Sequence, residues 1–239
     1  MHSPIRPTTI DDIAIRARNV TLTLGTDAAP TEILHGIDLD VPTGQSLAIL
    51  GPSGSGKSSL MAILSGLERA TGGDVEVAGM VYTGRNEDAL ARARRGRIGI
   101  VLQSFHLLPT MTALENVAVP LELAGLDAAF DRARTELEAV GLGHRVTHYP
   151  AQLSGGEQQR VAIARAVAPG PAILFADEPT GNLDETTSAG IVDLLFQRRA
   201  AAGATLVIIT HDPSLAERCD RVLRMRDGRI ASDSLAVRA

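Results

Sequence analysis

A glycine-rich stretch in the first quarter of the sequence has the composition of a phosphate-binding loop. Residues 51–58 read GPSGSGKS and fit the pattern G-x-x-x-x-G-K-[ST] without deviation. Glycines allow backbone N–H groups to close around an anion, and a helix that begins after the loop presents its positive end to the same anion. An apolar stretch precedes the loop and an amphipathic stretch follows it, which disfavours a purely structural turn. The loop therefore predicts binding of a nucleoside triphosphate.

Lys57 is the only lysine of a chain that carries 23 lysine and arginine residues in total. Its slender ammonium group suits the inside of a phosphate loop, whereas a planar guanidinium suits phosphate recognition from outside. Lys57 is therefore expected to reach the β- and γ-phosphates, and the Ser58 hydroxyl is expected to bind Mg²⁺. The predicted nucleotide-binding residues are Gly51, Pro52, Ser53, Gly54, Ser55, Gly56, Lys57, Ser58 and Ser59.

Two adjacent acidic residues end a second apolar stretch. Residues 172–178 read AILFADE, and charged side chains after a buried strand are costly unless they have partners. In P-loop enzymes an acid at this position holds Mg²⁺, which predicts that role for Asp177. Glu178 would then orient or deprotonate the attacking water. The alternative, in which Asp177 caps a turn and Glu178 is solvated, is disfavoured by the phosphate loop.

A third stretch, residues 153–160, reads LSGGEQQR. Ser154 followed three residues later by Glu157 forms a capping box, which predicts the start of a helix. The two glycines between them leave the backbone open to an anion at that helix N-terminus. Capping alone would explain the pattern structurally. The stretch also resembles the signature motif of the ATP-binding cassette (ABC) ATPases, and its spacing to the acidic pair fits that family.

Further motifs resemble the same family over nearly the whole length of the chain. Gln103 matches the Q-loop glutamine, which in the family contacts Mg²⁺ and the attacking water. His211 matches the switch histidine, which contacts the γ-phosphate, and residues 181–184 (GNLD) match the D-loop. The resemblance implies ATP and Mg²⁺ as cofactors. The implied catalytic residues are Glu178, His211 and Gln103, and the implied metal ligands are Ser58, Gln103 and Asp177.

The resemblance also implies a homodimer that forms on ATP binding. In this family each ATP lies between the phosphate loop of one subunit and the signature motif of the other. The phosphate loop and the capped helix start are both suited to bind an anion, so two copies of the chain could each supply one half of such a site. In the dimer Asp184 would cross the interface. The residues implied to contact the partner's ATP are Ser154, Gly155, Gly156 and Glu157.

Two longer stretches of sequence resemble one branch of the family in particular. Residues 175–184 (FADEPTGNLD) and 103–109 (QSFHLLP) are similar to ATP-binding subunits that serve lipoprotein release, macrolide export and related exporters. This similarity implies an integral-membrane permease as a partner. It also implies a peripheral location on the cytoplasmic face of the bacterial inner membrane. Apolar residues between 104 and 124, where they do not belong to the core, would line a groove for a permease helix.

One position departs from the family pattern. Members usually stack the adenine on an aromatic residue near the end of the first strand, whereas the matching position here is Leu24. Apolar contact from Leu24 is expected to hold the base, with weaker selection of ATP over GTP.

Alternating strands and helices must position these residues. Alternation and apolar runs predict a strand or hairpin at 74–82 and strands at 13–24, 33–41, 46–50, 97–102, 172–176, 204–210, 221–226 and 229–233. A period of 3.6 residues predicts helices at 57–67, 86–95, 112–124, 127–141, 155–168, 185–201 and 213–218. Asp227-Gly228 predicts a hairpin turn between the last two strands.

The order of elements and the resemblance together predict one α/β domain over residues 1–239. Strands that alternate with helices indicate a sheet covered on both faces. The expected fold is the P-loop NTPase core of an ABC ATPase, with a mixed, mainly parallel sheet and an antiparallel β subdomain. A helical subdomain is expected to be inserted at about 104–168.

Composition sets limits on the function. The net charge of −5 argues against a nucleic-acid binder, and Cys219, the only cysteine, favours a reducing compartment. Residues 1–7 lack a signal-peptide core, and no apolar run approaches the ~18–20 residues that span a bilayer. A role in a membrane process would therefore act from the water phase or through a partner. The basic run 91–97 is interpreted as a solvated helix face, and His144 and His148 as structural or solvated.

Three other functions compete with that of a transporter ATPase. A soluble ABC ATPase of translation or DNA repair usually carries duplicated cassettes or long coiled coils, for which 239 residues leave no room. A P-loop kinase would not need the motif at 153–160. A regulatory ATPase that drives envelope machinery without carrying a substrate stays open. The sequence favours the ATP-hydrolysing subunit of an ABC transporter that powers a separate permease of an export or lipid-extraction type.

Overall fold

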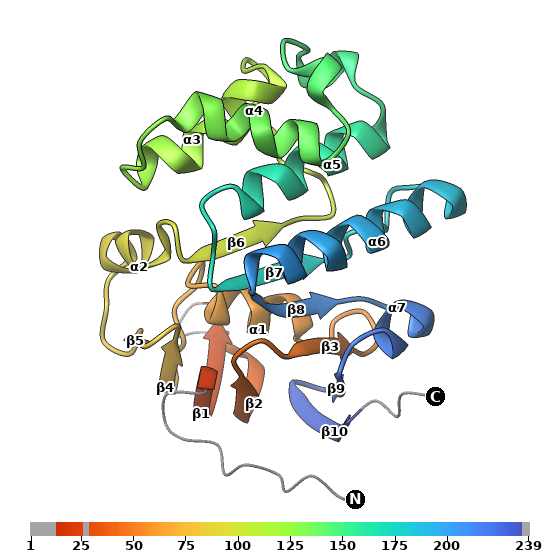
Figure 1. The fold of residues 1–239 in the computed structure, drawn as a ribbon. Helices are drawn as coiled ribbons and strands as arrows, with labels where there is room; N and C mark the ends of the chain where they lie inside the picture. The colour runs from red at the N-terminus through yellow and green to blue at the C-terminus, as the bar shows by residue number, and fades with distance from the viewer. Residues whose placement is uncertain (1–12, 26–28, 236–239) are drawn as a thin grey trace, which may run out of the picture.

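Two β-sheets and a layer of helices make up the computed structural model, which describes residues 13–25 and 29–235 (Figure 1). The larger sheet has six strands in the order β10-β9-β3-β8-β7-β6. Its strands are parallel except for β10, which pairs antiparallel with β9. This arrangement confirms the predicted mixed, mainly parallel sheet. The strands are β3 (Ser46–Leu50), β6 (Ile98–Val101), β7 (Ile173–Asp177), β8 (Thr205–Ile209), β9 (Arg221–Arg226) and β10 (Arg229–Leu235).

The smaller sheet is antiparallel, with the strand order β2-β1-β4-β5. The stretch 74–82 forms a hairpin because Ala78 and Gly79 adopt positive φ angles of 50° and 73°, as a tight two-residue turn requires. The strands of this sheet are β1 (Ile13–Leu24), β2 (Thr31–Pro42), β4 (Gly72–Val77) and β5 (Met80–Val81).

Four helices pack beside the sheets, and the first departs most from its predicted bounds. The first helix ends at Leu64 rather than at residue 67, because Gly66 turns into the left-handed region with φ 72°. Leu67 is consequently 50% exposed and does not continue the apolar face. The helices are α1 (Lys57–Leu64), α2 (Glu87–Arg94), α6 (Glu185–Ala202) and α7 (Pro213–Glu217).

Three further helices form a separate layer above the larger sheet (Figure 1). They are α3 (Ala113–Leu123), α4 (Ala129–Ala139) and α5 (Gly155–Val167). Between α4 and α5 lie two 3₁₀ turns, Gly143–Arg145 and Pro150–Gln152, which the sequence did not predict because such turns are too short for a periodic pattern. An ion pair between Glu136 of α4 and Arg198 of α6 joins this layer to the rest of the molecule.

The larger sheet separates two hydrophobic cores. Ile173 and Phe175 of β7 enter the core shared with the smaller sheet and α1, whereas Leu174 and Ala176 enter the core shared with α3–α6. Side chains of a strand alternate between the faces of a sheet, so β3 and β8 are divided in the same way. All five residues of β3 and of β8 are buried, which anchors the loops at their carboxyl ends.

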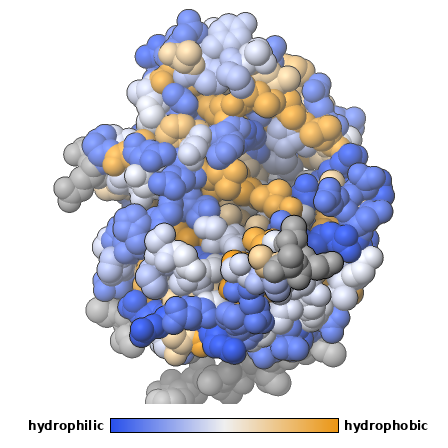
Figure 2. All heavy atoms as spheres, turned by 180° about the vertical axis from the view of Figure 1, so that it is seen from behind, coloured by the Kyte–Doolittle hydropathy of each residue, from blue (hydrophilic) through white to orange (hydrophobic). Residues whose placement is uncertain are grey.

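Hydrophobic side chains also reach the surface. Seen from behind, they gather in a band between the helical layer and the lower part of the molecule (Figure 2). The exposed large hydrophobic residues of the helical layer include Leu108 and Leu123, which are 43% and 59% exposed.

Candidate nucleotide site and catalytic centre

The glycine-rich loop joins β3 to α1 and is enclosed on two sides. A Cβ atom at Gly51 would lie 2.4 Å from the carbonyl oxygen of Met225, and one at Gly56 would lie 2.8 Å from a methyl group of Leu34. Gly56 also has φ 94° at the start of α1, a conformation that L side chains rarely adopt. Glycine is therefore required at these two positions for the loop to close as it does.

The turn of the C-terminal hairpin braces the same loop. Asp227 and Gly228 adopt φ angles of 49° and 68°, which confirms the predicted hairpin turn. The Gly228 N–H donates to the carbonyl oxygen of Ser55 at 3.2 Å, and the His35 N–H donates to the carbonyl oxygen of Gly228 at 3.0 Å. The hairpin thus connects the phosphate loop to the smaller sheet.

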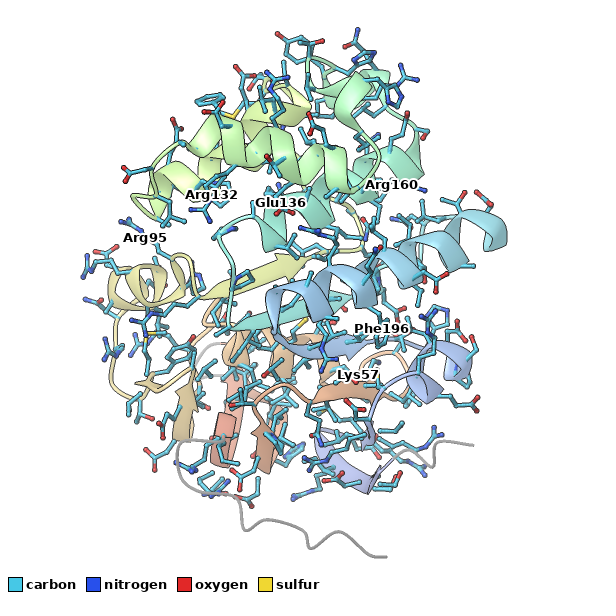
Figure 3. All side chains as sticks on the ribbon, in the orientation of Figure 1. Lys57, Arg95, Arg132, Glu136, Arg160 and Phe196 are labelled. Atoms are coloured by element: carbon cyan, nitrogen blue, oxygen red, sulfur yellow. The ribbon has the colours of Figure 1, made fainter. Side chains whose placement is uncertain are left out.

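Lys57 lies folded against the loop that carries it. Its Nζ donates to the carbonyl oxygens of Gly51 at 2.9 Å and Pro52 at 2.8 Å, and the residue is only 9% exposed. Figure 3 shows it in the lower part of the molecule, below α6. These carbonyls compensate the ammonium charge and hold it inside the loop, as its slender shape allows.

The loop and three later segments surround a pocket of about 550 Å³, here called the phosphate-loop pocket. Its later segments follow β6, β7 and β8, and ligands of open α/β sheets bind at such carboxyl ends. Of the residues predicted to bind the nucleotide or to act in catalysis on the same side, the pocket contains every one except Pro52. Its lining consists of Ile33, Gly51, Ser53, Gly54, Ser55, Gly56, Lys57, Ser58, Ser59, Gln103, Asp177, Glu178, Ile209 and His211.

Asp177 has an environment that fits a metal ligand. Burial at the end of β7 raises the pKa of its carboxyl group, and the nearby charge of Glu178 raises it further. A hydrogen bond to Ser58 and the positive charge of Lys57 lower the pKa and offset part of this effect. Hydroxyl and carboxylate oxygens are ligands that Mg²⁺ accepts together with nucleotide phosphates. The contact of Ser58 with Asp177 therefore brings two suitable oxygen ligands together beside the loop.

Glu178 occupies a strained backbone position next to His211. Its φ of 44° is left-handed, which costs a non-glycine residue about 1–3 kcal/mol and is typical of active sites. Its N–H donates to the carbonyl oxygen of Ile209 at 2.9 Å. Its Oε2 lies 2.9 Å from Nδ1 of His211. The Glu178 side chain is 17% exposed and the His211 side chain 76%, so the carboxylate is partly shielded while the imidazole faces open space.

The capping box predicted at the start of α5 is present. The Ser154 N–H donates to Oε2 of Glu157 at 2.8 Å, and the Glu157 N–H donates to Oγ of Ser154 at 3.3 Å. Arg145 adds an Nε–H bond to Oε1 of Glu157 at 3.1 Å. The Ser154 N–H above all, with help from Arg145, lowers the pKa of Glu157.

A second pocket of about 460 Å³ lies at this helix start and is here called the signature pocket. Asp184 borders it and caps α6, accepting from the Thr187 N–H at 3.0 Å. The signature pocket shares no lining residue with the phosphate-loop pocket. Within one chain, the residues predicted to bind the nucleotide and those predicted to contact the partner's ATP therefore line different pockets. Its lining consists of Gly141, Leu142, His144, Ser154, Gly155, Gly156, Glu157, Arg160, Asn182, Leu183, Asp184 and Thr187.

Several residues lie where the sequence did not place them. Ile33 forms a wall of the phosphate-loop pocket, whereas Leu24 is 45% exposed and is not part of its lining. His144, interpreted as structural or solvated, lines the signature pocket. Cys219 is buried and burial raises its pKa to about 12, so its thiol stays protonated at neutral pH.

The basic run 91–97 is more than the solvated face that the sequence suggested. Arg94 donates to the carbonyl oxygen of Gly66. Together with Arg95 it borders a groove of about 480 Å³ that also contains Leu108 and Leu123. This groove lies between α2, β6, α3 and α5 and is lined mainly by apolar surface.

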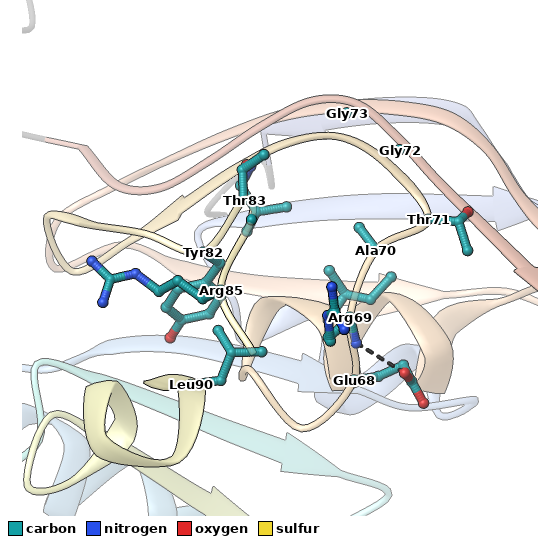
Figure 4. Close-up of a pocket in the computed structure, with 13 residues that line it drawn as sticks. Glu68, Arg69, Ala70, Thr71, Gly72, Gly73, Tyr82, Thr83, Arg85 and Leu90 are labelled. Atoms are coloured by element: carbon teal, nitrogen blue, oxygen red, sulfur yellow. Dashed lines mark hydrogen bonds between the residues drawn. The ribbon is translucent and has the colours of Figure 1, made fainter. Parts of the chain in front are cut away.

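A smaller cavity of about 180 Å³ lies away from the predicted catalytic residues, between the end of α1 and the β4–β5 hairpin (Figure 4). Tyr82 borders it and is 6% exposed. Burial raises the pKa of Tyr82 to about 12, so its hydroxyl stays protonated at neutral pH.

The fold and the phosphate-loop pocket define a P-loop nucleoside triphosphatase. Residues 34–181 match the family described as ABC transporter, and the chain belongs to this family. Among the residues that the structure describes, no helix is long and apolar enough to cross a bilayer. The chain is thus an ATP-binding, ATP-hydrolysing subunit of an ABC transporter, the class of subunit that powers a separate membrane permease.

Similar proteins include two groups of bacterial ATP-binding subunits. The uncharacterized ABC transporter ATP-binding protein YbbA of Escherichia coli K12 is 46% identical over 222 residues, which cover 92% of this chain and 97% of that protein. The lipoprotein-releasing system ATP-binding protein LolD of Anaeromyxobacter dehalogenans is 50% identical over 206 residues, which cover 85% of this chain and 86% of LolD. The similarity to LolD agrees with the branch that the sequence motifs indicated.

The solved structures that resemble this chain are ABC cassettes. The MJ0796 cassette, a dimer in a post-hydrolysis state with ADP and phosphate, superimposes with a TM-score of 0.86 at 36% identity, covering 94% of this chain and 100% of that one. The cbiO1 subunit of Clostridium perfringens, part of the cbiONQ transporter complex, gives a TM-score of 0.82 at 27% identity, covering 94% of this chain and 89% of that one.

Proposed function

We propose that two copies of this chain bind two MgATP molecules between them, each nucleotide held by the phosphate-loop pocket of one copy and the signature pocket of the other. The observation that supports this proposal is that the phosphate loop and the capped start of α5 line two different pockets, which have no residue in common. Each is open and has features suited to an anion, and a second copy would supply to each what the same chain places elsewhere. Asp184, at the edge of the signature pocket, would cross between the copies.

In the phosphate-loop pocket, Lys57 and the backbone N–H groups of residues 51 and 53–59 would hold the β- and γ-phosphates. Ser58 and Asp177, which contact each other beside the loop, would hold Mg²⁺, with Gln103 near the same oxygens. When bound, Mg²⁺ neutralises charge on the phosphate oxygens. The ion would thereby give the Asp177 carboxylate, which is costly to bury alone, an oppositely charged partner.

Hydrolysis requires a water in line with the γ-phosphorus and a group that accepts its proton. Glu178 is that group in this proposal, because its shielded carboxylate stands at the mouth of the pocket. His211, 2.9 Å from Glu178, orients the carboxylate and contacts the γ-phosphate. The water oxygen bonds to phosphorus, the bond to ADP breaks, and the proton passes to Glu178.

The energy is proposed to move a permease of an export or lipid-extraction type, since LolD serves lipoprotein release and lies among the most similar relatives. The apolar groove beside α2 and α3 would hold a cytoplasmic helix of that permease. The subunit would then lie peripherally on the cytoplasmic face of the bacterial inner membrane. Residues 1–239 would act as one cassette, with 104–168 as its helical subdomain.

Two variants test the composite site. Glu178→Gln should bind MgATP normally, lower hydrolysis by at least about a thousandfold, and accumulate as an ATP-dependent dimer in size-exclusion chromatography with light scattering. Ser154→Arg, placed in the Glu178→Gln background, should still bind ATP but stay monomeric, because its bulk and charge block the signature pocket. A Glu178→Gln protein that remains monomeric with saturating ATP would contradict the shared site.

A further inference from the structure

Gln159 is a fully buried polar residue on α5, two positions beyond Glu157. It is 0% exposed, and its Nε2 donates to the carbonyl oxygen of Pro179 at 2.7 Å. A backbone carbonyl can only accept, so the amide must present its nitrogen rather than its oxygen to Pro179. Its Oε1 is buried without a hydrogen-bond partner. An apolar residue of the same shape would avoid that desolvation cost, so stability alone does not account for a glutamine here.

The carbonyl that Gln159 holds belongs to the turn that carries Glu178. This turn runs from Glu178 to Gly181 and is closed by the Gly181 N–H, which donates to the carbonyl oxygen of Glu178 at 3.0 Å. Its first residue has the left-handed φ of 44°. The bond from Gln159 therefore holds the Pro179–Thr180 peptide unit, the second peptide unit after the strained residue, inside the turn that sets the direction of the Glu178 carboxylate.

The start of α5 is also packed against the segment that follows this turn. A Cβ atom at Gly156 would lie 2.6 Å from Cγ2 of Thr187, and one at Gly155 would lie 3.3 Å from a methyl group of Leu183. The helix start that borders the signature pocket and the segment 179–187 are thus in close contact. The contacts of Gly155, Gly156 and Gln159 therefore link the start of α5 to this segment and to the turn of Glu178.

We propose that Gln159 is a positioning residue that ties the signature helix to the turn of Glu178 within one subunit. This inference rests on the proposed role of Glu178. Each signature pocket would face the ATP held by the partner subunit, so occupancy of one site would set the position of Glu178 in the other. The two hydrolysis sites of the dimer are then coupled through one buried hydrogen bond in each subunit.

The test replaces Gln159 with methionine, which keeps the volume and removes the donor. Gln159→Met should keep the Tm of the wild type or exceed it, and its Kd for ATP should stay within about twofold. Its kcat should fall about tenfold, and the Hill coefficient of hydrolysis should fall toward 1. Gln197→Met, the same exchange at an exposed position of α6, should leave all four quantities unchanged.

A second variant separates positioning from packing. In Gln159→Glu a protonated carboxyl group can donate to the Pro179 carbonyl, whereas a carboxylate cannot. Burial favours the protonated form, so the kcat of Gln159→Glu relative to the wild type should rise as the pH falls from about 8 to 6. A kcat of Gln159→Met within twofold of the wild type, or a kcat ratio of Gln159→Glu that is flat with pH, would overturn the inference.

The outcome with Glu178→Gln distinguishes the two proposals. If Glu178→Gln still hydrolyses ATP, the proposed role of Glu178 fails and Gln159 has nothing to position. If Glu178→Gln is inactive while Gln159→Met turns over normally, the site stands and only the coupling through Gln159 is refuted.

Discussion

Replacing Lys57 with arginine should weaken ATP binding although the charge is kept. Lys57 is 9% exposed, and its ammonium group donates to two loop carbonyls at 2.9 and 2.8 Å. A guanidinium is planar and wider, so it cannot occupy that position while also reaching the phosphates. A hydrogen bond to a charged group contributes about 1.5–3 kcal/mol. Loss of one such bond to phosphate corresponds to a Kd for ATP that rises roughly 10- to 150-fold.

The assay is isothermal titration of MgATP into the nucleotide-free protein, with Lys57→Met as a second variant that lacks the charge altogether. Thermal unfolding without nucleotide reports how far the loop itself is disturbed. Arg226→Lys, an exchange on a side chain that is 78% exposed, serves as the control. Binding by Lys57→Arg within twofold of the wild type would refute the argument that shape, and not charge alone, selects lysine here.

Three other changes have defined outcomes. Leu24→Tyr should lower the Kd for ATP about fivefold or more, because stacking on a base contributes ~1–3 kcal/mol; an unchanged ratio of ATP to GTP hydrolysis would show that the base lies elsewhere. Asp177→Asn should raise the Tm of the nucleotide-free protein at pH 7, because burial raises the pKa of Asp177 and ionisation then costs stability. This gain should disappear as the pH falls below about 4, where the aspartate is protonated in both the folded and the unfolded state, and a gain that persists there would contradict the burial argument. Leu123→Asp, at a position 59% exposed beside the apolar groove, should leave ATPase activity unchanged and abolish co-fractionation with membranes that contain the permease, whereas retained binding would exclude this groove.

The features that the sequence predicted are those with a local cause. The phosphate loop, the capping box of Ser154 and the turn at Asp227-Gly228 each depend on residue types within a few positions of one another. The positions of Asp177 and Glu178 followed from a buried strand that must end before charged residues begin. The order of strands and helices, together with the family resemblance, likewise predicted the mixed sheet.

The features that the sequence did not predict depend on segments far apart in the chain. Gln159 looked like any polar residue of a helix, because its partner at Pro179 is reached only after the chain has passed through β7. His144 acquired its place in the signature pocket from a short 3₁₀ turn that has no periodic signal. The exposure of Leu24 could not be inferred from its family position either, because it depends on which residues of other segments pack against the end of β1.

The brace between the C-terminal hairpin and the phosphate loop has a consequence for how this protein is made. Gly228 contacts Ser55 across more than 170 residues of intervening chain, so the loop lacks this support until residue 228 has left the ribosome. Contacts of such long sequence separation form late and slowly. A nascent chain would therefore bind nucleotide fully only after the β9–β10 hairpin has been synthesised and has packed against the loop.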